Sequence, residues 1–500
     1  MELMRKQMRG YRVLQSPVQQ FEQQMDLIIP DVNPDALAVV GAWGDCVVTE
    51  QQLRRDRVTA AGVVNFTLLY RPENGGSAMP LQGSLNFQEM LECKDAAEED
   101  LLFLHAELTE LRGVILNSRK VGVQCKVAMY VWVYQRGDQL LTEGAESKPE
   151  EGIQLRVEHH QVHSLTAALE KTLTVNEEVR IGESTAQFQL LHTELQWKAE
   201  DVRMLNKKMM VRGAVQVRVL LLSETETLRE MEYALPFSQI AESSEVKPDC
   251  SAMLHYTTAQ QQIRLERRED GLFLCCALGA KVMMEVYREQ RETVVADLYS
   301  TQYHTCVKRE NLPVCNCKTD RVSAQVRETI STETQVAKVL QWHVMGTSAE
   351  VRGGKLLGTV YLSVLWEDET GHRMQQCVTV RDERDGADIC SGGSNLAARS
   401  LSVTPAHGGF AVELQLQYCV RLQNTVQGQQ VASCDLDIAR PRAGYAPGTL
   451  LLRTVEVNES TWDLARDYGT TESAILAANH LMQDQTLEAN QLVLIPFLRK

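Results

Sequence analysis

Three segments of the chain repeat one pattern: GVVNFTLLY at residues 62–70, GAVQVRVLL at residues 213–221 and GTVYLSVLW at residues 358–366. In each segment, the residues two, four, six and eight positions after the glycine are large and apolar. Alternation with a period of two is typical of a β-strand with one buried face. The opposite face carries polar residues such as Asn65 and Gln216, so we expect it to be partly solvated. Because the glycines are roughly 150 residues apart, the pattern predicts three copies of one domain.

A second alternating segment follows in each copy, at residues 121–133, 274–286 and 410–420. A Leu-x-Phe segment lies between the two strands in the first two copies, ending at Phe87 and Phe237, and the third copy has only the weaker Val378 and Val380. Turn-forming stretches separate the strands. The fold class is therefore mainly β, with three repeated antiparallel β-rich domains. We also expect short helices near residues 34–40 and 159–173.

These patterns place the domains along the chain. We expect β-rich repeats at residues 1–150, 151–305 and 306–440, a proline-containing linker at 441–450, and a small C-terminal domain at 451–500. Five hundred residues exceed what one hydrophobic core organises, which agrees with several domains.

The composition excludes some classes of function. The formal net charge of −15 would repel a nucleic-acid backbone, so we expect no nucleic-acid partner. No stretch approaches the length of apolar sequence that spans a membrane, and no export signal is evident at the N-terminus. The thirteen cysteines are scattered and odd in number, which favours reduced thiols in a cytoplasmic compartment.

The last fifty residues read as strand, helix, helix, strand. Residues 454–457 and 492–495 are strand-like, and the first helix covers residues 462–468. Ser460 or Thr461 caps its start and Gly469 its end. Thr470 or Thr471 caps a second helix that ends at Asn479.

This small domain resembles a LysM domain, through residues that include Trp462, Tyr468, Gly469 and Pro496. Asn458 and Asn490 stand where the family has glycine, and asparagine tolerates the left-handed backbone of such turns. We expect Trp462 to pack in the core. By resemblance, the ligand groove consists of Asn458, Glu459, Ser460, Thr461, Asn479, His480 and Leu481. The first four replace the family's Gly-Asp-Thr-Leu loop.

The three repeats resemble the SPOCS domains of SipL-type spore-coat morphogenetic proteins. The resemblance lies in the opening LIIPDVNPDALAVV at residues 27–40, in the Gly-x-Val-x-Phe strand and in the domain order. It implies an adaptor in the mother-cell cytoplasm that is recruited to the forespore surface and spore coat. Its partners would be the coat's morphogenetic ATPase and other coat proteins. The alternative is a cell-wall anchor that binds peptidoglycan or chitin-like polymers of N-acetylglucosamine.

No catalytic or nucleotide-binding motif is present at its proper spacing, so we predict no enzyme and no cofactor. Two clusters contain residue types that bind metal ions. One is Glu158, His159, His160 and His163 on an expected helix, and the other is His304, Cys306, Cys315 and Cys317 at a junction between copies. The favoured interpretation of the first group is a solvated turn. The Cys-x-Cys spacing of the second is tighter than that of the common zinc knuckle. We therefore predict no metal site and leave zinc at the second group open.

Overall fold

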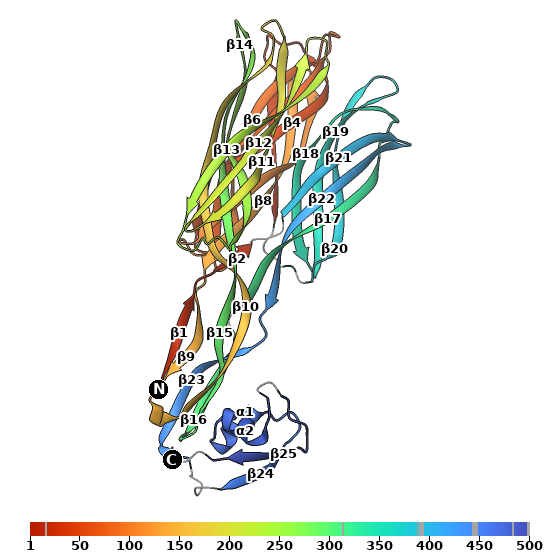
Figure 1. Cartoon of the computed structure of the whole chain (residues 1–500). Helices are drawn as coiled ribbons and strands as arrows, with labels where there is room; N and C mark the ends of the chain where they lie inside the picture. The colour runs from red at the N-terminus through yellow and green to blue at the C-terminus, as the bar shows by residue number, and fades with distance from the viewer. Residues whose placement is uncertain are drawn as a thin grey trace.

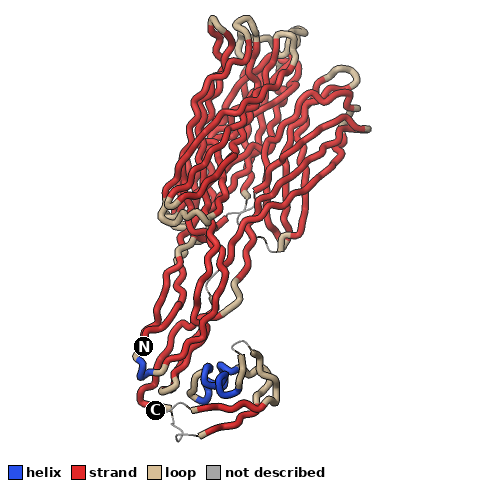
Figure 2. The backbone as a smooth tube through the Cα atoms, in the orientation of Figure 1, coloured by secondary structure: helices blue, strands red, loops and turns tan. Residues whose placement is uncertain are grey.

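The computed structural model describes residues 1–15, 18–312, 315–387, 389, 395–442, 449–482 and 485–497. Strands dominate it, and the mainly β class is confirmed (Figure 2). None of the helices in these ranges is long and apolar enough to cross a membrane.

The first unit contains nine strands. They are β1 (Glu2–Met8), β2 (Tyr11–Gln15), β3 (Gln19–Ile28), β4 (Ala36–Arg54), β5 (Arg57–Pro72), β6 (Met79–Glu92), β7 (Leu101–Asn117), β8 (Lys120–Arg136) and β9 (Gln139–Glu146). Strands β4, β5 and β6 form one antiparallel sheet, and β8 pairs with β2, β3 and β7 in a second. The two sheets face each other across a shared apolar core. A short 3-10 helix, Pro149–Glu151, leads to the second unit.

The second and third units repeat this arrangement as two three-stranded sheets each, ordered β10-β15-β14 and β11-β12-β13, then β17-β22-β21 and β18-β19-β20. The strands of the second unit are β10 (Ile153–Gly182), β11 (Phe188–Leu205), β12 (Lys208–Ser223), β13 (Leu228–Glu242), β14 (Ser251–Arg268) and β15 (Gly271–Ser300). Those of the third are β16 (Tyr303–Asn311), β17 (Cys315–Ser331), β18 (Val336–Arg352), β19 (Lys355–Asp368), β20 (Arg373–Asp385), β21 (Asn395–Ala406), β22 (Gly409–Thr425) and β23 (Gln429–Pro441). Each unit has its own core.

The repeated glycine segments form the central strands β5, β12 and β19. The predicted apolar positions are buried, as at Val64, Val215 and Val360, which are 0% exposed. The opposite face of these strands is more buried than expected. Leu69, Leu220 and other residues of that face are buried in a cluster that draws on all three units, because the sandwiches pack against one another.

The glycines that open these strands make room for an aromatic ring. Gly62 pairs with Phe87 across the sheet, and a Cβ on Gly62 would lie 2.3 Å from that ring. Gly213 pairs with Phe237 in the same way. This covering of a strand glycine by an aromatic side chain explains the Leu-x-Phe segment. In the third unit Tyr418 of the other sheet approaches Gly358 instead, which accounts for the missing phenylalanine.

The two expected helices near residues 34–40 and 159–173 are wrong, because both segments are strands. Residues 36–40 begin β4, and residues 159–173 lie within β10, which pairs with β15 along its length. Leucine and alanine are good helix formers, but this preference amounts to a fraction of a kcal/mol per residue. Ladder hydrogen bonds and the burial of Leu165, Ala167 and Ala168 outweigh that preference.

Below the sandwiches, three two-stranded ribbons form a stalk (Figure 1). They are β1 with β9, the first part of β10 with the last part of β15, and β16 with β23. Each unit contributes two residues to one apolar layer: Met8 and Leu141, Val162 and Val294, and then Leu312 and Val426, which lie just outside the strands of the third ribbon. The three units thus share one apolar core in the stalk.

A buried ionic network joins the units above the stalk. Glu285 of β15 and Arg421 of β22 are 0% and 1% exposed and form an ion pair, in which Arg421 Nε donates to Glu285 Oε2 at 3.2 Å. Tyr134 of the first unit and Tyr287 each donate a hydroxyl to the carboxylate at 2.6 Å, and His255 Nε2 lies 3.0 Å from it. Burial raises the pKa of Glu285, but Arg421 and His255 outweigh burial and hold it well below its usual range.

The C-terminal domain has the predicted order: β24 (Leu450–Thr454), α1 (Thr461–Tyr468), α2 (Glu472–Asn479) and β25 (Leu492–Pro496). Strand β24 pairs antiparallel with β25, and it ends at Thr454, where the sequence predicted a strand to begin. Both helices pack on one face of this strand pair, beside the end of the stalk (Figure 1). Most of the expected linker, residues 443–448, lies outside the described residues.

Candidate binding site of the C-terminal domain

The loop that enters helix α1 is held by local hydrogen bonds. Ser460 is the N-cap: its Oγ accepts from Asp463 N at 3.2 Å, and Asp463 Oδ2 accepts from Ser460 N at 3.2 Å. Asn458 has φ +64°, and Asn490 has φ +69°. Both asparagines therefore adopt the left-handed conformation that the family reserves for glycine, as the sequence predicted.

Two other residues of the predicted groove support the loop from within. Thr461 is buried, and its hydroxyl donates to Glu472 Oε1 at 2.6 Å, which links the two helices. The Glu459 carboxylate accepts from Glu456 N at 2.8 Å and lies 3.6 Å from Arg453. Their polar groups are committed to the fold of the domain rather than free for a ligand.

At the end of helix α2, Asn479 is also structural. Its Nδ2 donates to Ile475 O and Leu494 O at 2.7 Å, and its Oδ1 accepts from Leu494 N at 2.7 Å. These bonds fasten the helix to β25. His480 has φ +55° as the C-cap and is exposed, and Leu481 is half-buried. Of the seven predicted groove residues, Asn458 and His480 are thus the two that are exposed.

Trp462 lies in the core, as expected, and part of that core belongs to the stalk. It is 6% exposed and packs edge-on against Tyr299 of β15, with ring centroids 4.8 Å apart. Its Nε1 donates to Asp297 Oδ2 at 2.9 Å. The tryptophan therefore fastens the domain to the second unit.

Asp297 is the ionic centre of this junction. Arg309 of β16 lies 2.6 Å and Arg466 of α1 3.1 Å from its carboxylate oxygens. Burial raises the pKa of Asp297, but the bonds from Arg309 and Trp462 outweigh burial and lower it below its usual value. The sequence did not predict a role for Asp297, because the whole third unit separates it from Trp462 along the chain.

A second contact holds the carboxyl end of helix α1. Arg442, which follows β23, donates from Nη1 to Arg466 O at 2.7 Å and Asp467 O at 3.3 Å. A cation at this end of a helix complements the helix dipole. Tyr299 Oη adds a bond to Thr470 O at 2.9 Å. The domain is thus docked on the stalk by the packing of Trp462, by the ion pair of Asp297 with Arg466, and by the hydrogen bonds from Arg442 and Tyr299.

The two groups weighed as metal ligands do not form a site in the described residues. Residues 158–163 lie on a strand, so His159 and His163 share a face but are about 13 Å apart along it. His160 turns to the other face, beside Glu158. His304 and Cys306 lie on β16, whereas the side chains of Cys315 and Cys317 are outside the described residues. No group of three potential ligands is found in the described ranges.

Comparison with known proteins agrees with the geometry of the C-terminal domain. The LysM domain family model matches residues 454–496. No curated protein and no solved structure matches the chain. Residues 454–496 therefore form a LysM domain, which supports a carbohydrate- or peptidoglycan-binding module, and not a catalytic one, at the end of the stalk.

Proposed function

We propose that the chain is a non-enzymatic scaffold of spore-coat assembly. It holds a LysM domain at a fixed position on the three β-rich units, which are together called the β body. In this proposal it acts in the mother-cell cytoplasm at the forespore surface. The LysM domain binds a protein of the coat, in the first place its morphogenetic ATPase. The resemblance of the repeats to SPOCS domains supports this setting.

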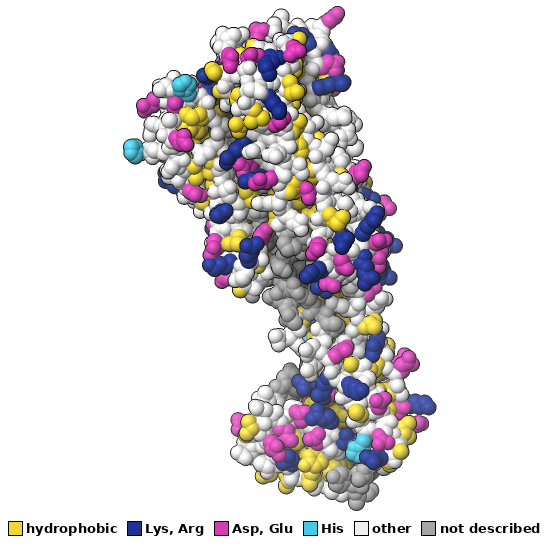
Figure 3. Space-filling model, turned by 180° about the vertical axis from the view of Figure 1, so that it is seen from behind, with side chains coloured by type: hydrophobic (Ala, Val, Ile, Leu, Met, Phe, Trp, Pro, Cys, Tyr) yellow, Lys and Arg dark blue, Asp and Glu magenta, His cyan; other side chains and the backbone are white. Residues whose placement is uncertain are grey.

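The main support for protein binding is an exposed apolar face on the LysM domain. Leu450, Leu452 and Leu492 lie on the side of the β24–β25 pair that faces away from the helices, and they are 67%, 66% and 64% exposed. Figure 3 shows hydrophobic side chains at this end of the molecule. Adjacent exposed leucines are typical of protein interfaces. The polar groups of the groove residues Thr461 and Asn479, by contrast, form hydrogen bonds within the domain itself.

Glycan binding is the second candidate, and the family match at residues 454–496 favours it. The exposed side chains of Asn458 and His480 would provide its polar contacts. The apolar face and the groove do not share residues, so the two candidates are separable by mutation.

The test uses the full chain and two sets of variants. Leu452→Lys disrupts the apolar face, and Ile240→Lys on β13, where Ile240 is 52% exposed, is the matched control. Asn458→Gly with His480→Gly removes the groove side chains and keeps the positive φ angles. Binding is measured to the purified coat ATPase by interferometry and to peptidoglycan by sedimentation.

Loss of ATPase binding in Leu452→Lys alone is the outcome we expect. ATPase binding that survives Leu452→Lys would overturn the docking face. Peptidoglycan binding that is lost in the double glycine variant, without any ATPase binding by the wild type, would establish the wall anchor in place of the scaffold.

A further inference from the structure

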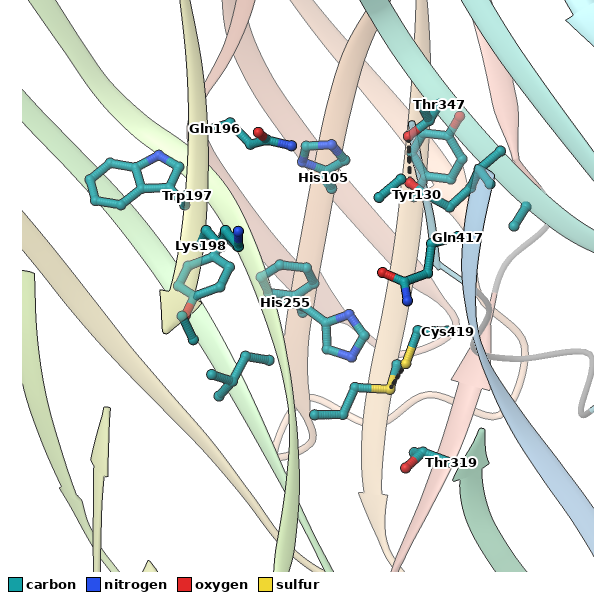
Figure 4. Close-up of a pocket in the computed structure, with 18 of the residues that line it drawn as sticks. His105, Tyr130, Gln196, Trp197, Lys198, His255, Thr319, Thr347, Gln417 and Cys419 are labelled. Carbon is teal, nitrogen blue, oxygen red and sulfur yellow. Dashed lines mark hydrogen bonds between the residues drawn. The ribbon is translucent and has the colours of Figure 1, made fainter. Parts of the chain in front are cut away.

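A cavity of about 860 Å³ lies where the three units meet, above the stalk. Figure 4 shows polar side chains reaching it from strands of all three units. These are His105 and Tyr130 from the first unit, Gln196 and His255 from the second, and Thr347 and Gln417 from the third. Its volume is in the range of sites that hold a small organic ligand.

A second cavity of about 360 Å³ continues the first. The two share the lining residues His105, Glu107, Gln196 and Thr347. The smaller cavity adds His192 and His343, whose rings are 5.1 Å apart. The two cavities are therefore adjacent, and together they are called the channel.

Several buried polar atoms along this channel have no hydrogen-bond partner in the described part of the chain. They are Trp132 Nε1 and Tyr256 Oη at the larger cavity and both ring nitrogens of His343 at the smaller one. Trp132 is 5% and His343 2% exposed. Buried polar groups in proteins are almost always satisfied, and these three side chains line the channel, so a ligand or water in the channel is the partner open to them.

The chemistry of these atoms restricts the ligand. An indole N–H only donates, whereas a phenol and a neutral imidazole both donate and accept. His343 is neutral, because burial, and then the neighbouring His192, lowers its pKa well below the usual value. A ligand that satisfies all three residues must carry acceptors and donors together, as hydroxyl groups do.

Charge and shape restrict the ligand further. The lining of the larger cavity carries charges of both signs, namely Lys198 and Arg321 with Glu107, Glu200 and Asp320. Glu107 accepts from Thr347 N at 2.7 Å, and the remaining charges balance, which favours a ligand without net charge. One wall is aromatic: the ring of Trp132 lies 6.1 Å from that of Tyr130 and 5.7 Å from that of Phe103. Such a wall suits the apolar C–H face of a sugar ring, while the polar side chains suit its hydroxyls.

We infer that this channel is a binding site for a neutral oligosaccharide, separate from the LysM domain. The ligand would lie between the units, in contact with all three, and would satisfy the unpaired donors of Trp132 and Tyr256. The inference goes beyond the proposed scaffold role and does not depend on what the LysM domain binds.

The test is hydrogen–deuterium exchange of the full chain with the neutral di- and tetrasaccharides of N-acetylglucosamine. We expect slower exchange in β7 and β14, which line the channel. Trp132→Phe and Tyr256→Phe each remove one hydrogen-bonding group and should weaken this binding about tenfold, the effect of one lost hydrogen bond. Trp366→Phe is the matched control, because Trp366 Nε1 is also buried and unpaired among the described atoms but lines neither cavity.

The location of protection separates the outcomes. Protection confined to residues 454–496 would overturn the channel as a saccharide site and leave the LysM domain as the binding module. Protection of β7 and β14 that persists at full affinity in both phenylalanine variants would also overturn it. Tyr256→Phe removes a single oxygen atom and guards against a folding defect in Trp132→Phe. Unchanged exchange throughout the chain would exclude this ligand class for both sites.

Discussion

Glu285 and Asp297 are carboxylates of the same strand, β15, and each joins parts of the chain that are distant in sequence. Glu285 is 0% exposed and bonds to groups of all three units. Asp297 is also buried, at 6% exposed, but its ionic partners Arg309 and Arg466 are 39% and 32% exposed. The position of the partners therefore decides what each carboxylate does: Glu285 joins the three β-rich units to one another, and Asp297 joins the LysM domain to the stalk.

The largest effect is expected at the buried network. Glu285→Ala removes the carboxylate that neutralises the buried charge of Arg421, and we expect it to lower the free energy of unfolding by about 3–5 kcal/mol. Denaturant titration monitored by circular dichroism measures this loss. The double variant Glu285→Leu with Arg421→Leu removes both charges and should regain most of it. Equal losses in the single and double variants would contradict the role given to the ion pair.

A smaller and more local effect is expected at the stalk. Asp297→Asn removes the charge that faces Arg309 and Arg466, and we expect a loss of about 1–3 kcal/mol in docking of the LysM domain. Faster hydrogen exchange in α1, with an unchanged unfolding midpoint for the β body, is the expected result. Glu456→Gln is the control, because Glu456 is exposed and its carboxylate pairs with Arg453 within the domain. Equal effects of the two substitutions would show that Asp297 has no special role.

Acid should weaken both sites in the same direction. The folded-state pKa values of Glu285 and Asp297 are lowered, so their contributions are fully present above the unfolded pKa of about 4 and are lost as the pH falls below it. Each unit of lowering corresponds to about 1.4 kcal/mol. Unfolding measured between pH 7 and pH 3 should therefore show a shallower slope in the Glu285→Leu, Arg421→Leu variant than in the wild type. Parallel curves would contradict this.

The smallest effect is expected at the hydroxyl group of Tyr299, on the same strand. Tyr299→Phe removes one bond to the carbonyl of Thr470 and should cost about 1 kcal/mol, measured as exchange in α1. Tyr287→Phe removes a donor to the buried carboxylate of Glu285 and should cost about 1.5–3 kcal/mol in global unfolding. A larger effect of Tyr299→Phe than of Tyr287→Phe would contradict the roles given to the two sites.

Features that depend on a few neighbouring residues were predictable from the sequence. The alternation around Val64, Val215 and Val360 predicted buried strand faces, because successive side chains of a strand point to opposite sides. Ser460 and Gly469 marked the ends of helix α1, because capping involves only the residues beside the helix terminus.

Features that depend on distant residues were not predictable. Residues 159–173 form a strand because β15, more than a hundred residues later, supplies a full ladder of partners. The second faces of β5 and β12 are buried because three sandwiches pack together. Local preference amounts to a fraction of a kcal/mol per residue, so such contacts override it.

The binding sites divide in the same way. Local patterns along the chain were sufficient to predict the three β-rich repeats, the LysM domain and the packing of Trp462 in a core. The three-dimensional packing was needed to find that Trp462 contacts Asp297 and Tyr299, that Asn479 bonds to β25, and that a polar channel lies between the units. The physical reason is that a hydrogen bond or cavity between distant segments depends on how they pack in space, which leaves no periodic trace along the chain.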